Sequence, residues 1–159
     1  MKIAIEAKTV TPWHIAASCT FVGGALALVS WYQPWFTMHF STPNTQPFIE
    51  SPYAVVQDPS GYAAWLVLGV SLAVALSGLS LFAWHKPQLI AVQTALIAGL
   101  GIAIFAVLGD MGVPRFFTNE HAPGVSLLPE WGVYLMLLSF VLCLAASIML
   151  WRHMRSMRA

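Results

Sequence analysis

Four long stretches without Asp, Glu, Lys or Arg dominate the pattern of hydrophobic and polar positions along the chain. A helix that crosses the hydrocarbon core of a bilayer needs about 20 mostly apolar residues, and each stretch is long enough to hold one. We therefore predict four membrane-spanning helices, over approximately 13–35, 62–84, 88–109 and 131–151.

Each predicted helix is apolar on all sides, and this excludes the other folds that long apolar runs can form. Buried helices of a soluble protein would keep a polar face toward water. Membrane-spanning strands would alternate, and runs such as Trp65-Leu66-Val67-Leu68 do not. Because backbone groups in lipid must pair internally, helices remain. We expect an all-α fold, a transmembrane four-helix bundle that forms a single domain over 1–159.

Composition supports this interpretation and narrows the function. Hydrophobic residues make up 58% of the chain and charged residues 8%, whereas soluble domains carry about 25% charged residues. The net charge of +1 argues against a nucleic acid as a partner. Lys2 and Lys8 could begin a signal peptide, but the apolar run continues through Trp35 without a clear cleavage site. We expect the first helix to be retained.

The positive charges predict the orientation. Six of the seven Lys and Arg residues fall in the N-terminal segment, the turn near Lys86 and the C-terminal tail. The positive-inside rule places both termini and this turn in the cytoplasm, with the chain integral to the plasma membrane. Tryptophan and tyrosine prefer the headgroup layer, and they form two belts that agree with this topology. The belts are Trp13, Trp84 and Trp151 on one side, and Trp31, Tyr32, Trp35, Tyr62, Trp131 and Tyr134 on the other.

Two outer segments, 36–61 and 110–130, are then extracytoplasmic. The first is large and rich in proline, and its composition favours extended or turn structure. A short strand at Tyr53–Gln57 is one option. Apolar residues such as Phe36 and Phe48 would let this loop fold over the bundle.

Stripes of small residues predict where the helices approach closely, because helices associate in lipid through close packing rather than hydrophobicity. The helix at 88–109 carries Ala91, Ala95, Gly99 and Ala103 at four-residue spacing. Similar stripes are Ala16, Thr20 and Gly24 in the first helix, Gly69, Ala73 and Ser77 in the second, and Ser139, Cys143 and Ser147 in the fourth. We favour packing within the monomer as their role, and contact with another subunit is the alternative.

The polar residues offer little for chemistry. No two histidines share a helix at ligand spacing, so a haem between the spans is not expected. His14 is the one candidate cofactor ligand, for a chlorophyll magnesium near the inner surface, and an ordinary interfacial histidine is the favoured interpretation. Cys19 and Cys143 form no CxxC pair. Gln93 is the deepest strongly polar side chain, and Asp110 has Arg115 as its candidate partner.

The segment from Trp31 to Trp35 is the most distinctive short sequence. The two indoles share a face if the helix continues past them, although Pro34 would disturb or end that helix. An interfacial anchor is the favoured interpretation. The alternative is an aromatic platform that contacts a partner or a lipid.

This segment also carries a resemblance to known families. The cytoplasmic termini and the large first outer loop, which begins with Trp31-Tyr32-Gln33-Pro34-Trp35, resemble the claudin/PMP22-like tetraspan architecture. Together with Ser60-Gly61-Tyr62 and Gly132-Val133-Tyr134-Leu135, they resemble small bacterial tetraspan membrane proteins of uncharacterised function. The paired cysteines and Gly-Leu-Trp of the claudin loop are absent, so the resemblance implies a topology rather than an activity.

We expect a non-catalytic membrane subunit that docks on and stabilises a larger membrane protein complex, with a respiratory or photosynthetic assembly as a possible host. Its partners would be membrane lipids and other integral subunits or copies of itself. The alternative is a tetraspan binder of a lipid, quinone or pigment near Trp31, Trp35 and His14. A self-assembled channel is disfavoured, because an ion path needs a chain of polar groups across the bilayer.

Overall fold

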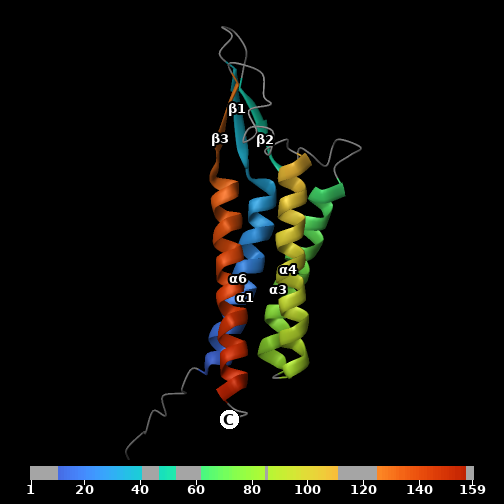
Figure 1. Ribbon diagram of the computed structural model, residues 1–159, viewed down its shortest axis with the longest axis vertical. Helices are drawn as coiled ribbons and strands as arrows, with labels where there is room; N and C mark the ends of the chain where they lie inside the picture. The colour runs from blue at the N-terminus through green and yellow to red at the C-terminus, as the bar shows by residue number, and fades with distance from the viewer. Residues whose placement is uncertain (1–10, 41–46, 53–61, 85, 111–124, 157–159) are drawn as a thin grey trace, which may run out of the picture.

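The structure is a computed structural model that describes residues 11–40, 47–52, 62–84, 86–110 and 125–156. Four long helices run side by side and make up most of the described chain (Figure 1). Each is long and apolar enough to span a membrane. They are α1 (Pro12–Tyr32), α3 (Tyr62–Ala83), α4 (Pro87–Asp110) and α6 (Trp131–Ser156). The four helices predicted from the uncharged stretches are confirmed.

Two helix ends differ from the prediction, each for a local reason. Helix α1 ends at Tyr32 rather than at 35, because Gln33 is extended and Pro34 lacks the N–H that a further turn needs. Helix α6 continues to Ser156, past the predicted end at 151. Its last turn contains His153 and Arg155, and cations are favourable near a helix C-terminus. Hydropathy follows the apolar span and does not detect such a polar extension.

A small antiparallel sheet lies at the end of the helices opposite the C-terminus of α6 (Figure 1). Its strands are β1 (Phe36–Phe40), β2 (Phe48–Glu50) and β3 (Val125–Pro129), in the order β2-β1-β3. β1 follows α1 and β3 precedes α6, so this helix pair continues upward as a strand pair, with Thr37 opposite Leu128. The expected all-α class therefore omits a sheet. The predicted strand at Tyr53–Gln57 lies outside the described residues.

Helix α1 is the central element. It packs extensively against both α3 and α6, whereas α4 packs mainly against α3 and only sparsely against α6. The backbones of α1 and α3 touch where a Cβ on Gly24 would lie 2.4 Å from the amide nitrogen of Ala75. On the side of α1 that meets α6, a Cβ on Gly23 would lie 3.0 Å from the carbonyl oxygen of Ser139. Consecutive glycines thus allow α1 to approach two helices closely, as small residues do in membrane proteins.

The predicted stripes of small residues divide into two groups. The stripes of α1 and α6 are buried: Ala16, Thr20 and Gly24, and Ser139, Cys143 and Ser147. In α3 the predicted stripe begins with the exposed Gly69, and the buried face instead contains Ser71, Ala75 and Gly78. The preference for packing within the monomer is confirmed for α1 and α6 and is wrong for Gly69.

Tryptophan indoles join α1 to α3 at both ends of the pair. Trp13 donates its Nε1–H to the carbonyl oxygen of Leu81 at 2.7 Å, and Trp31 donates to that of Ala64 at 2.8 Å. Both rings are buried. By contrast, Trp84 and Trp131 are 59% and 75% exposed, as interfacial anchors would be. The two predicted belts therefore contain interior tryptophans as well as surface ones.

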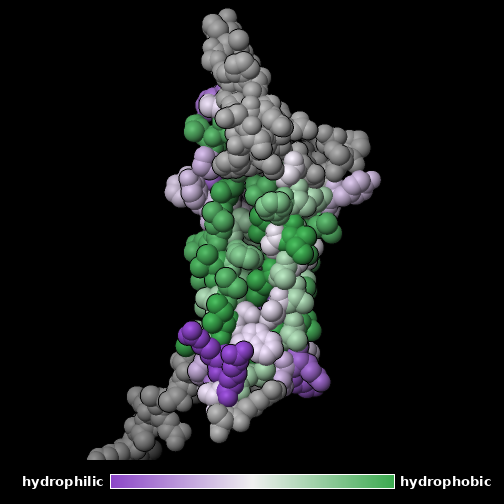
Figure 2. Space-filling view, viewed as in Figure 1, coloured by the Kyte–Doolittle hydropathy of each residue, from purple (hydrophilic) through white to green (hydrophobic). Residues whose placement is uncertain are grey.

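The outer surface of the helices is apolar. Figure 2 shows hydrophobic residues as a band across the visible face of the helices, with strongly hydrophilic residues below it at the end where α6 terminates. Exposed large apolar side chains occur on all four helices. A helix surface that is apolar all round fits lipid and does not fit water. Four apolar helices with this surface indicate a membrane-embedded protein.

Candidate interaction surface

The outward side of α4 is the first candidate site, because this helix packs least extensively against the other helices. The predicted stripe on it is only partly outward: Ala91 and Ala95 are exposed, Gly99 is half-buried and Ala103 is buried. Residues spaced by four advance about 40° around a helix at each step, since 3.6 residues complete a turn. The stripe therefore turns from the surface into the interior. Ala91 and Ala95 are accessible to an external partner, whereas Ala103 packs within the protein.

A straight stripe lies beside it. Alternating steps of four and three residues keep to one side of a helix, as in helix–helix seams. On α4 these steps connect five exposed residues, which we call the α4 outward face: Ala91, Ala95, Ala98, Ile102 and Phe105. Sequence reasoning missed its last three members because it followed a strict four-residue spacing. The alternating spacing was the signal that could have found them.

The α4 outward face combines a smooth half and a protruding half. The three alanines leave the helix backbone accessible over the half nearer Pro87. Ile102 and Phe105 follow toward the sheet, and they are 72% and 76% exposed. A flat surface next to two projecting side chains can accept another helix in a defined position, because close approach and interlocking contacts drive helix association in lipid.

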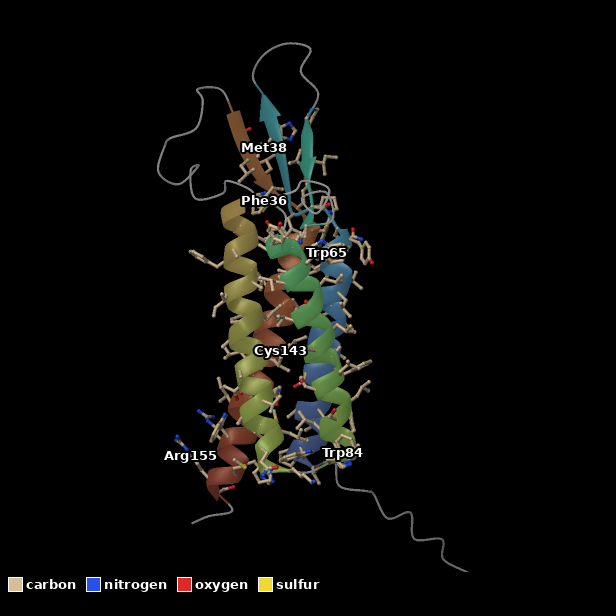
Figure 3. The ribbon with its side chains drawn as sticks, turned by 90° about the vertical axis from the view of Figure 1, so that its right-hand side faces the viewer. Phe36, Met38, Trp65, Trp84, Cys143 and Arg155 are labelled. Carbon is tan, nitrogen blue, oxygen red and sulfur yellow. The ribbon has the colours of Figure 1, made fainter. Side chains whose placement is uncertain are left out.

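Trp31 and Trp35 do not form such a surface. Their exposed fractions are 2% and 0%, and the extended Gln33 separates them, so they share no helical face. Trp35 donates its Nε1–H to the carbonyl oxygen of Ser30 at 2.9 Å. Both rings pack the sheet end of the helices, which leaves little of either ring at the surface for the expected partner or lipid contact. In Figure 3 this end is marked by Phe36 and Trp65.

His14 lies far from both tryptophans. It shares a hydrogen bond with Thr11, and its ring centroid is 6.2 Å from that of Phe82. At about 1.5 Å of rise per residue, roughly 26 Å of helix separates His14 from Trp31. The two ends of α1 therefore cannot surround one headgroup or pigment ring, so His14 and the two tryptophans would belong to separate ligand sites. Among the described residues, no three His, Cys, Asp or Glu gather as a metal site would require.

The interior polar groups mostly bond across helices. Gln93 of α4 is fully buried and donates its side-chain amide to the hydroxyl of Thr20 of α1. Ser139 donates to the carbonyl oxygen of Gly23 at 2.7 Å. Cys19 and Cys143 are free thiols, and Cys143 lies midway along the helices (Figure 3). These contacts position helices, and they bring no nucleophile and base together within the described residues.

The remaining predicted partners cannot be placed. The side chain of Asp110 and the whole of Arg115 lie outside the described residues, as do most of the two outer segments.

Comparisons with protein-family models, with curated proteins and with solved structures find no match to this chain.

Proposed function

We propose that this protein is a non-catalytic integral membrane subunit that docks on and stabilises a larger membrane protein complex through the α4 outward face. The observation that carries the proposal is the straight, exposed stripe in which three alanines precede Ile102 and Phe105. Lipid tails are as apolar as leucine, so exposed large side chains alone are neutral in a membrane. Exposed small residues are different, because they let a second backbone approach closely.

The poor packing of α4 within the monomer supports the same idea. α4 meets α3 closely, but it meets α6 sparsely. Even at Gly99, between α4 and α3, the nearest atom to an added Cβ is Val70 Cγ1 at 3.9 Å. A helix with only one extensive partner in its own fold keeps more of its surface for an external contact. A neighbouring subunit on the α4 outward face would give α4 the second close partner that α1 already has.

The finer features of the proposal come from the sequence. The four helices would form a bundle in the plasma membrane, with the Pro-rich first loop outside and both termini in the cytoplasm. The distribution of Lys and Arg supports this orientation. The claudin/PMP22-like resemblance supports the tetraspan topology, and a respiratory or photosynthetic complex would be a suitable host.

The test is affinity purification of the full chain in mild detergent, followed by a native gel and mass spectrometric identification of partners. Ala95→Leu fills the smooth half of the α4 outward face and should abolish co-migration with the complex. Ala145→Leu is the matched control, because Ala145 is also an exposed alanine and lies at a similar position along the helices. The hydrogen bond between Thr94 and Ser147, close to these two alanines in the sequence, shows that the two segments are level. Ala145→Leu should leave the complex intact.

Two results would contradict the proposal. The first is a native chain that always migrates alone at its own mass. The second is a complex that persists in Ala95→Leu or that Ala145→Leu disrupts to the same extent. Either result would mean that the α4 outward face faces only lipid.

A further inference from the structure

A groove lies between α4 and α6 near the end of α6. Its volume is about 350 Å³, and its walls include Thr94, Leu144, Ile148, Trp151, Arg152 and Arg155. The two helices that form it pack only sparsely against each other. A second groove of about 520 Å³ lies toward Pro12 of α1 and shares Ile148 and Arg152 with the first. One ridge of α6 thus separates two open grooves.

The groove changes from apolar to cationic along its length. Leu144 and Ile148 are 44% and 47% exposed and lie within the apolar helix α6. Arg152 and Arg155 lie one to two turns further along α6, and both are exposed. In Figure 3 the side chain of Arg155 projects outward from the lower end of α6. Such a gradient matches the gradient of a membrane lipid, from acyl chain to charged headgroup.

Trp151 lies where the lining of the groove changes from apolar to cationic. Its Nε1–H donates to Thr94 Oγ1 at 3.1 Å, and Thr94 Oγ1 also shares a hydrogen bond of 3.0 Å with Ser147 Oγ. The indole is therefore held as a wall of the groove by a contact that joins α6 to α4. Indole rings prefer the headgroup layer of a bilayer, so the guanidinium groups next to it lie where lipid phosphates lie.

The two guanidinium groups have no anionic partner in the described part of the protein. Neither Arg152 nor Arg155 makes an ion pair or hydrogen bond with any other residue through its side chain there. The described residues at this end also include Lys86 and His153 and no acidic residue. Guanidinium binds phosphate with two parallel hydrogen bonds, which makes arginine suited to this task.

We propose that the groove between α4 and α6 binds an anionic membrane phospholipid, with the phosphodiester on Arg152 and Arg155 and an acyl chain along Leu144 and Ile148. Basic pockets between membrane helices are known to bind anionic headgroups. The site shares no residue with the α4 outward face, so it stands or falls independently of the proposed function.

Native mass spectrometry of the delipidated full chain in detergent tests the site directly. Phosphatidylglycerol should bind at about tenfold lower concentration than phosphatidylcholine, which has the same phosphodiester but no net charge. Loss of one arginine should weaken phosphatidylglycerol binding about fivefold, since each cation near a membrane surface contributes about that factor. Arg152→Gln and Arg155→Gln are the variants, and Lys86→Gln is the control that removes the same charge elsewhere at this end.

A second pair of variants tests the groove without changing charge. Ile148→Trp adds bulk to a residue that lines both grooves, and it should reduce phosphatidylglycerol binding while both arginines remain. Leu76→Trp places the same side chain on α3, at a position that is 53% exposed and lines neither groove, and it should have no effect. Melting temperatures of all variants should match that of the native chain, because every substituted residue is exposed.

Three outcomes would overturn the proposal. The first is equal binding of phosphatidylcholine and phosphatidylglycerol. The second is a loss in Lys86→Gln or Leu76→Trp as large as that in the groove variants, which would indicate general attraction without a site. The third is displacement of the lipid by glycerol 3-phosphate at equal concentration, which would assign the arginines to a soluble phosphate ester.

Discussion

Gly132 lies directly against the indole ring of Trp35. A Cβ added to Gly132 would lie 2.4 Å from Cδ1 of Trp35 and 2.5 Å from the carbonyl oxygen of Pro34. Two hydrogen bonds hold the same junction: Gly132 N–H donates to Pro34 O at 2.9 Å, and Ser30 Oγ donates to Gly132 O at 2.8 Å. The first turn of α6 is thereby attached to the residues that lead from α1 into β1.

Gly132→Ala should therefore destabilise the protein. The new methyl group overlaps a buried ring and a backbone oxygen, and overpacking of this kind costs about 1–3 kcal/mol. Thermal unfolding of the detergent-solubilised chain measures the loss. Gly109→Ala is the control, because nothing lies within 4 Å of its added Cβ. An unchanged melting temperature in Gly132→Ala would show that the contact between Gly132 and Trp35 is not tight.

Gly24→Ala should weaken the contact between α1 and α3. Its Cβ would meet the backbone nitrogen of Ala75 at 2.4 Å, and a backbone atom cannot rotate away. We expect a loss of about 1–3 kcal/mol in the free energy of unfolding. Gly69→Ala on α3 meets nothing within 4 Å and should stabilise by up to about 1 kcal/mol, since alanine favours a helix over glycine. Equal effects from the two substitutions would contradict the close approach of α1 and α3.

The helices could be predicted from the sequence because the bilayer acts on each of them separately. A stretch of about 20 uncharged residues must be helical in lipid whatever its neighbours are. Hydropathy does not determine where α1 ends, because Pro34 is compatible with either a kinked continuation or a stop. The structure ends α1 at Tyr32 and places Trp35 in the next element.

The sheet was harder to predict, because its pairing joins segments far apart in the chain. Phe36-Thr37-Met38-His39-Phe40 alternates between apolar and polar residues, as a half-buried strand does, and this signal was available. Its partner β3 reads Val-Ser-Leu-Leu-Pro and alternates poorly. The packing of α1 against α6 places the two strands side by side, and it is not visible in the local sequence of either strand.

The candidate site was predicted in part for a similar reason. The spacing of Ala91 and Ala95 identified the correct helix, but sequence periodicity does not tell which side of α4 meets α3. Likewise, hydropathy and residue type treat all indoles as interfacial anchors. Which tryptophans turn inward depends on neighbouring acceptors such as the carbonyl oxygens of Leu81 and Ala64.

Those inward indoles lead to a third prediction. Trp31→Phe keeps an aromatic ring but removes the hydrogen bond of 2.8 Å to Ala64 O and leaves a small void. Interhelical hydrogen bonds in membrane proteins contribute about 0.6 kcal/mol on average, and the void adds to the loss, so we expect about 1–2 kcal/mol. Trp84→Phe is the control, because Trp84 is 59% exposed, and it should change stability by less than about 0.5 kcal/mol. A larger effect at Trp84 than at Trp31 would contradict the structural role of the buried indole.

The fourth prediction concerns the orientation in the membrane. Ser126 is exposed on β3 and Ser156 is exposed at the last residue of α6, so α6 separates the two positions by its full length. In a chain that carries Cys19→Ala and Cys143→Ala, we would introduce either Ser126→Cys or Ser156→Cys. A maleimide that cannot cross membranes is then added to intact cells.

The proposed topology predicts labelling of the Ser126→Cys variant from outside, and labelling of the Ser156→Cys variant only after the cells are permeabilised. Both variants should react equally in detergent, which controls for the reactivity of each thiol. The opposite pattern would place the arginine-rich end of α6 outside and invert the protein, against the positive-inside rule. Labelling of both variants in intact cells would be more damaging, because α6 would then not cross the membrane at all.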